Sequence, residues 1–157
     1  MEISDVYRGL GEEAFGKLIR CISIGKLKTF QVYEGLKVRA HLNKLNQESL
    51  RKSAPRFWER IMSGDEEFGR DLAQSVLVSH LDMIVAALDL LGVPHENGFF
   101  AKDLNPEPHF TPGWEMRVFE ALKGTHPEVT IIFYINHLRW ELLKAETVFQ
   151  PAGSPAA

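Results

Sequence analysis

The pair His137 and Glu141 has residue types and a spacing that could support chemistry. The two residues lie four positions apart, with Phe133 and Trp140 beside them. In a helix they would share one face, where the carboxylate could orient the imidazole as a base or help it bind a metal. The alternative is an ordinary pair of neighbouring side chains next to two packed aromatic rings. Neither a Glu-x-x-His nor an HExxH motif accompanies the pair, which favours this alternative.

A second histidine, His80, lies in the longest apolar segment of the chain, 65–91. Helical periodicity places it among apolar side chains and opposite a stripe of acidic residues. We therefore expect His80 to point inward. It is either a neutral core histidine bonded to a carbonyl or hydroxyl group, or a ligand or general base in an internal pocket.

The segment 93–113 also collects polar donors. It contains four prolines and two glycines, and we expect a loop of about twenty residues, held on the core by its aromatic side chains. The imidazole and carboxylate groups of this loop are of types that zinc or manganese accepts. Their spacing matches no metal signature, and we predict no metal site.

These observations lead to one pocket hypothesis. A ligand pocket would be walled by the inward face of segment 65–91, the loop 93–113 and the last helix, a mixture of apolar wall and few polar groups. Its residues would be His80, His95, Phe99, His109, Phe133, His137, Trp140 and Glu141.

A basic ridge suggests a different kind of site. Between positions 17 and 60 there are eleven Lys or Arg and three acids, although the whole chain has a net charge of −3. Lys52, Arg56 and Arg60 recur every four residues and could contact phosphate groups, in the outline of a helix-turn-helix. The expected turn glycine is missing, and a solvated charged face is the alternative.

The hydrophobic pattern predicts an all-α protein, a single-domain bundle of five to six helices around a long central helix at about 65–91. The domain would cover 1–149, followed by a flexible tail, 150–157. Other helices are expected at 4–22, with a break near Gly9–Gly11, and at 27–42, 46–62 and 112–123. The last helix follows Pro127 and includes the β-branched stretch 129–135.

Composition restricts the function classes. A single cysteine excludes an internal disulfide and fits a reducing compartment, and we expect a cytoplasmic protein with no signal peptide and no membrane span. No nucleotide-binding loop, nucleophile elbow or CxxC motif is present, so a cofactor remains unknown. The first hypothesis is a binding module for itself, another protein or a small ligand. The alternatives are an enzyme or metalloprotein using the pocket above, and a nucleic-acid-binding module using segment 26–60.

Overall fold

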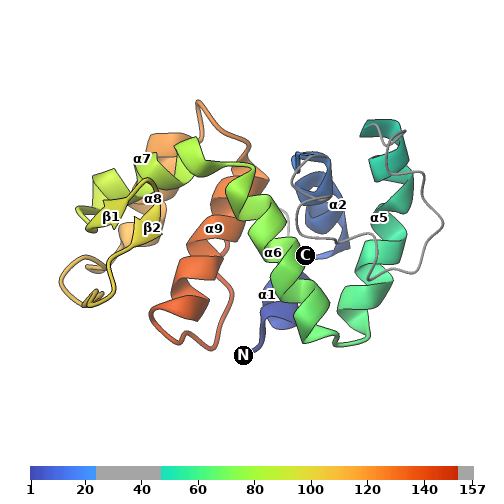
Figure 1. The fold of residues 1–157 in the computed structure, drawn as a ribbon, viewed down its shortest axis with the longest axis horizontal. Helices are drawn as coiled ribbons and strands as arrows, with labels where there is room; N and C mark the ends of the chain where they lie inside the picture. The colour runs from blue at the N-terminus through green and yellow to red at the C-terminus, as the bar shows by residue number, and fades with distance from the viewer. Residues whose placement is uncertain (24–46, 152–157) are drawn as a thin grey trace. The chain divides into compact units, whose positions relative to one another are not determined.

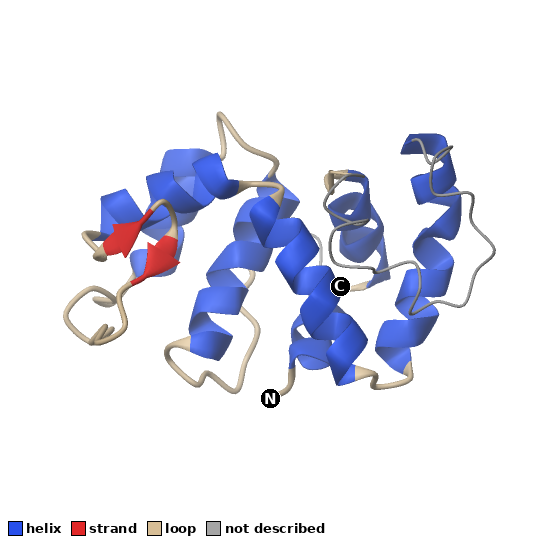
Figure 2. Ribbon diagram, viewed as in Figure 1, coloured by secondary structure: helices blue, strands red, loops and turns tan. Residues whose placement is uncertain are grey.

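The computed structural model describes residues 1–23 and 47–151. The predicted helix 27–42 and most of the predicted tail lie outside these residues. The described chain is helical apart from one small hairpin, which confirms the all-α class (Figure 2). Its helices are α1 (Ile3–Leu10), α2 (Glu12–Arg20), α5 (Gln47–Met62), α6 (Glu66–Val78), α7 (Leu81–Leu91), α8 (Trp114–Leu122) and α9 (Glu128–Glu141), labelled in Figure 1.

The described residues form two compact units. The N-terminal unit is the described part of Glu2–Ser79, and the C-terminal unit is Met1 with the described part of His80–Pro155. The first contains α1, α2, α5 and α6; the second contains α7, α8, α9 and the hairpin β1 (His95–Glu96) and β2 (Phe99–Phe100). The single domain expected over 1–149 stays a prediction.

The single long helix predicted at 65–91 is wrong, because the helix breaks at Ser79–His80. The Ser79 hydroxyl donates to the carbonyl of Ser75 at 2.6 Å and accepts the backbone N–H of Ser23 at 2.9 Å. A serine hydroxyl that bonds to the carbonyl four residues earlier competes with the backbone hydrogen bonds of the helix. The same Ser79 oxygen also accepts a hydrogen bond from Ser23, which is distant in the sequence. His80 then takes φ −131° and ψ 43°, outside the helical region, and α7 starts anew.

Both ends of segment 65–91 were predicted correctly. The Asp65 carboxylate accepts the backbone N–H of Phe68 and caps α6, while Gly92 ends α7 in the left-handed region at φ 69°. Local capping chemistry thus determined the ends, and the break between them came from longer-range contacts.

In the N-terminal unit, the break expected near Gly9–Gly11 occurs at Gly11, whose φ of 93° suits glycine. Pro55 lies inside α5 rather than in the first turn of a separate helix. The Tyr7 hydroxyl donates to the carbonyl of Gly69 at 2.8 Å and joins α1 to α6. The packing of this unit therefore includes a fully buried and hydrogen-bonded tyrosine.

Helix α9 is the most fully buried of the three helices in the C-terminal unit. Every residue from Thr130 to Leu138 is buried, so the helix is covered on all sides. The stretch 129–135 is helical despite its β-branched residues, as predicted.

Asn136 on α9 anchors the segment that follows the helix. Its side-chain amide donates to the carbonyls of Ile132 (2.9 Å) and Phe149 (3.0 Å), and its side-chain oxygen accepts the backbone N–H of Phe149 (2.7 Å). Trp140 adds a bond from Nε1 to the Met1 carbonyl at 3.1 Å. Met1 and Phe149 are therefore both attached to α9.

We expect Asn136→Ala to lower the free energy of unfolding by about 2 kcal/mol, because both backbone groups of Phe149 would lose their partner. Urea unfolding measures this loss. Asn105→Ala is the control, since Asn105 is exposed in a loop and should change stability little. Equal stability of the two variants would contradict the anchoring role of Asn136.

The predicted core is only partly buried. The apolar stripes of the predicted helices 46–62 and 65–91 and of the last helix predict a shared core of eight residues: Phe57, Trp58, Leu77, Leu81, Ile84, Leu88, Leu138 and Leu142. Five of these are buried: Phe57, Leu77, Ile84, Leu88 and Leu138. The other three, Trp58, Leu81 and Leu142, are half-buried.

No single helix among the described residues is long and apolar enough to cross a membrane. Helices α6 and α7 meet the criteria of length and hydropathy only when they are taken together across the break between them.

Candidate functional site

The hairpin in the segment 93–113 was not predicted. His95 pairs with Phe100 and Glu96 with Phe99 in antiparallel register. The connecting Asn97 and Gly98 have φ values of 52° and 91°, and two positive φ values are typical of a tight hairpin turn. The Asn-Gly dipeptide between aromatic and charged residues was the sequence signal for it.

The hairpin is fastened to α7 at two points. A Cβ built on Gly98 would lie 3.2 Å from Cγ2 of Ile84, so the turn lies directly on the helix. The Nδ1 atom of His95 accepts the backbone N–H of Gly98 at 3.1 Å, and Nε2 lies 2.7 Å from Oδ1 of Asp89. Because Nδ1 accepts, the proton of the neutral ring is on Nε2, which donates to the carboxylate. His95 therefore has a positioning role in the hairpin.

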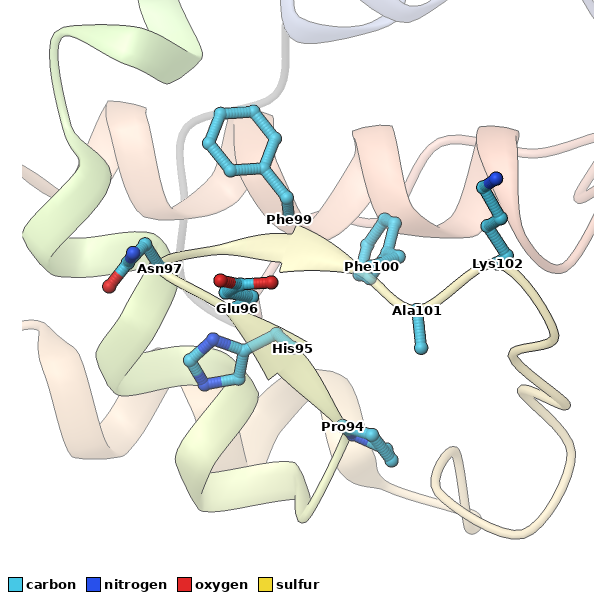
Figure 3. A pocket seen from close by; sticks show the side chains of 8 residues that line it. All are labelled: Pro94, His95, Glu96, Asn97, Phe99, Phe100, Ala101 and Lys102. Carbon is cyan, nitrogen blue, oxygen red and sulfur yellow. The ribbon is translucent and has the colours of Figure 1, made fainter.

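An open pocket of about 580 Å³ lies along this hairpin (Figure 3). Its lining residues are Pro94, His95, Glu96, Asn97, Phe99, Phe100, Ala101 and Lys102. Phe99 projects from β2 away from the His95 ring, and its side chain is 63% exposed. A large aromatic side chain held this far out on an anchored hairpin is typical of a contact surface. We call these eight residues the hairpin pocket.

A second candidate site lies on α9. Thr130, Tyr134, His137 and Glu141 are separated by four, three and four residues, so they share one face of the helix. The first three are buried, whereas the Glu141 side chain is 46% exposed. We call these four residues the polar stripe; three of its side chains are buried and the fourth, Glu141, reaches solvent.

Two hydroxyl groups of the polar stripe have no hydrogen-bond partner. Within the described part of the chain, neither Oγ1 of Thr130 nor the phenolic oxygen of Tyr134 is bonded. A buried hydroxyl left unpaired costs about 1–3 kcal/mol, and such groups in folded proteins normally bind a protein group, water or a ligand.

The polar stripe is uncharged over its buried length at neutral pH. Burial lowers the pKa of His137 to about 4, and burial together with the nearby Glu141 raises the pKa of Tyr134 well above that of a free tyrosine. Nδ1 of His137 lies 3.3 Å from Oε2 of Glu141, so a neutral ring meets the carboxylate. A base with a pKa near 4 holds few protons at neutral pH, which makes His137 a weak general base.

The residues of the predicted pocket occupy several places. His95 and Phe99 lie in the hairpin pocket. Phe133, His137 and Trp140 form a row on α9, with ring centroids 6.2 Å and 5.5 Å apart in that order, and Glu141 follows them.

The remaining two histidines belong to neither group. His80 is the half-buried residue at the N-cap of α7, not part of a buried helix face. His109 is half-buried in the loop before α8, where its backbone N–H donates to the carbonyl of Pro106. Neither lines the hairpin pocket.

The basic ridge on α5 is partly balanced by acids. Nζ of Lys52 lies 3.5 Å from Oε1 of Glu48, and Nε of Arg60 lies 3.0 Å from Oδ2 of Asp65. Arg56 is exposed. Two of the three proposed cations thus have an acidic neighbour, which reduces the field that would attract a phosphate backbone.

Residues 1–23 and 47–151 contain no group of three or more His, Cys, Asp or Glu side chains placed to hold a metal ion. The His137–Glu141 and His95–Asp89 contacts are pairs. No protein family, curated protein or solved structure matches this chain. The chemistry of its own residues therefore carries the functional argument.

The sequence hypothesis missed Thr130 and Tyr134. Their spacing from His137 and Glu141 was available in the sequence, but hydroxyl residues at these intervals are common in helices. What distinguishes them is burial without a partner, and that depends on tertiary structure.

Proposed function

We propose that this chain is a cytoplasmic protein-binding module that associates with a second copy of itself through the hairpin pocket. The observation that carries the proposal is Phe99, 63% exposed on a hairpin that is anchored to α7 by Gly98 and His95. A preorganised aromatic residue loses little conformational freedom on binding, and such residues dominate the energy of many interfaces.

The hairpin surface can pair with its own copy. In a two-fold contact, Phe99 of each copy would enter the hairpin pocket of the other. Glu96 and Lys102, both exposed, line the same pocket with opposite charges, so each can meet its opposite on the second copy. The surface is small, and the complex would be of the weak and transient class. The single cysteine supports the reducing compartment.

We expect Phe99→Ser to weaken self-association at least about tenfold, because it removes the central apolar contact. Sedimentation equilibrium over a range of protein concentrations measures this. Leu90→Ser is the matched control: Leu90 is 51% exposed, but helical geometry places it on the side of α7 away from Gly98. A wild-type protein that remains monomeric at millimolar concentration, or equal losses in both variants, would refute the proposal.

A charge exchange tests the two-fold geometry. Glu96→Lys and Lys102→Glu should each weaken association at low salt, since like charges would then face each other. The double variant restores opposite charges and should recover the wild-type affinity. Failure of the double variant to recover would contradict this pairing.

A further inference from the structure

Asp89 places a carboxylate where its own helix disfavours one. The residue lies in the last turn of α7, just before the left-handed Gly92, and this turn carries no basic residue. Negative charge at the C-terminal end of a helix is destabilising, because the free carbonyl groups there already carry negative partial charge. The Asp89 side chain is 67% exposed and bonds to His95. The stability of α7 itself therefore gives no reason for a carboxylate at this position.

The His95 ring connects this carboxylate to the turn of the hairpin. Nε2 lies 2.7 Å from Oδ1 of Asp89, and Nδ1 lies 3.1 Å from the amide nitrogen of Gly98. A backbone N–H can only donate, so Nδ1 presents its lone pair and the neutral ring carries its proton on Nε2. The groups that a histidine bonds set both its tautomer and the orientation of its ring. Asp89 and Gly98 thus hold the ring from its two nitrogen atoms.

We propose that Asp89 is a positioning residue of the interaction surface and that it acts through His95. Its carboxylate accepts the proton on Nε2, fixes the ring and so keeps Nδ1 available to the amide of Gly98. That bond closes the turn directly before Phe99. The effect on binding rests on the self-association proposed above, whereas the hydrogen bonds from Asp89 to Gly98 lie within one copy.

The hydrogen bond at Gly98 has a large influence because the hairpin is short. Each strand has two residues, and a two-stranded hairpin is only marginally stable by itself. Loss of one hydrogen bond at the turn would shift the equilibrium between its closed and open forms about fivefold. A copy with an open turn does not hold Phe99 in its bound position. Self-association therefore weakens by up to the same factor.

Hydrogen exchange of the Gly98 amide, measured by NMR on dilute monomeric protein, tests the hydrogen bonds themselves. Asp89→Ala should speed this exchange about fivefold. Asp89→Asn keeps an acceptor oxygen without the charge, and should retain most of the protection. Asp82→Ala is the matched control, since Asp82 is an exposed aspartate in the first turn of the same helix. Exchange that is unchanged in Asp89→Ala, or equally fast in Asp89→Asn or Asp82→Ala, overturns the positioning role.

A double-mutant cycle tests whether Asp89 acts through His95. His95→Asn keeps an acceptor for the Gly98 amide, because the asparagine oxygen takes the place of Nδ1, but this shorter side chain does not reach Asp89. Asp89→Ala should then leave Gly98 exchange unchanged in the His95→Asn background. A fivefold increase in that background would show that Asp89 acts by another route and would overturn the proposal.

Sedimentation equilibrium of the same variants connects the turn to binding. Asp89→Ala should weaken self-association about twofold to fivefold, and Asp82→Ala should leave it unchanged. Faster Gly98 exchange with unchanged association would show that the turn does not position Phe99, and this also overturns the proposal. A wild-type protein that stays monomeric refutes self-association instead, and Gly98 exchange then still confirms or refutes the role of Asp89 in the hairpin.

Discussion

Ile84→Ala is expected to lower the free energy of unfolding by about 2–5 kcal/mol, the usual cost of emptying a packed apolar site. Ile84 is 4% exposed, and its Cγ2 atom lies next to Gly98 at the turn of the hairpin. The substitution therefore leaves a cavity between α7 and the hairpin. Denaturant unfolding gives the loss, and hydrogen exchange of residues 95–100 should speed up with it.

The control for this experiment is Leu90→Ala on the same helix. Leu90 is 51% exposed, so its truncation should cost less than about 0.5 kcal/mol. A loss below about 1 kcal/mol for Ile84→Ala would mean that the hairpin does not rest on this side chain. The proposed interaction surface would then lose the rigid support that its affinity requires.

His137 is expected to make stability depend on pH. Its pKa is about 4 in the folded protein, against 6.5 for an unperturbed histidine. Between these values the unfolded chain binds more protons, so stability is fully present above about pH 6.5 and decreases as the pH falls toward 4. The expected loss over this window is about 3 kcal/mol.

Comparison of wild type with His137→Gln in urea unfolding from pH 7 to pH 4 measures the contribution of His137 to the pH dependence of stability. The stability difference between the two proteins should shift by about 3 kcal/mol in favour of the variant as the pH falls. His109→Gln, at a half-buried loop histidine, is the control. Partial burial raises the pKa of Glu141, so this residue makes stability increase as the pH falls and opposes the effect of His137. The comparison is therefore repeated in a Glu141→Gln background. A difference independent of pH would show that His137 is not buried.

Binary patterning and capping residues were sufficient to predict the helical class and most helix ends. Asp65, Gly92 and Pro127 act through bonds or dihedral preferences within a few residues, so their effect is readable without the rest of the chain. The last helix was predicted from an apolar stripe, although its first turns are β-branched; the stripe consists of Ile131, Ile135, Leu138, Leu142 and Ala145. The Asn97-Gly98 turn was equally local, and the hairpin was missed only because its strands are two residues long.

The break at Ser79–His80 depended on tertiary contacts. The apolar pattern continues through it, whereas the Ser79 hydroxyl is shared between a neighbouring carbonyl and the backbone of Ser23. No local rule predicts that second contact. With the helix interrupted, the angular positions assigned across 65–91 no longer applied, and His80 moved from a buried face to a helix terminus.

For the candidate sites too, sequence spacing determined some features and tertiary structure determined the others. Sequence spacing alone placed Phe133, His137, Trp140 and Glu141 along one helix, because side chains three and four residues apart are neighbours in any helix. Whether a polar group is buried and whether it has a partner are properties of the packed chain. The tertiary structure therefore decided that Asn136 is an anchor and that the hydroxyls of Thr130 and Tyr134 lack partners, although all three belong to the same predicted helix.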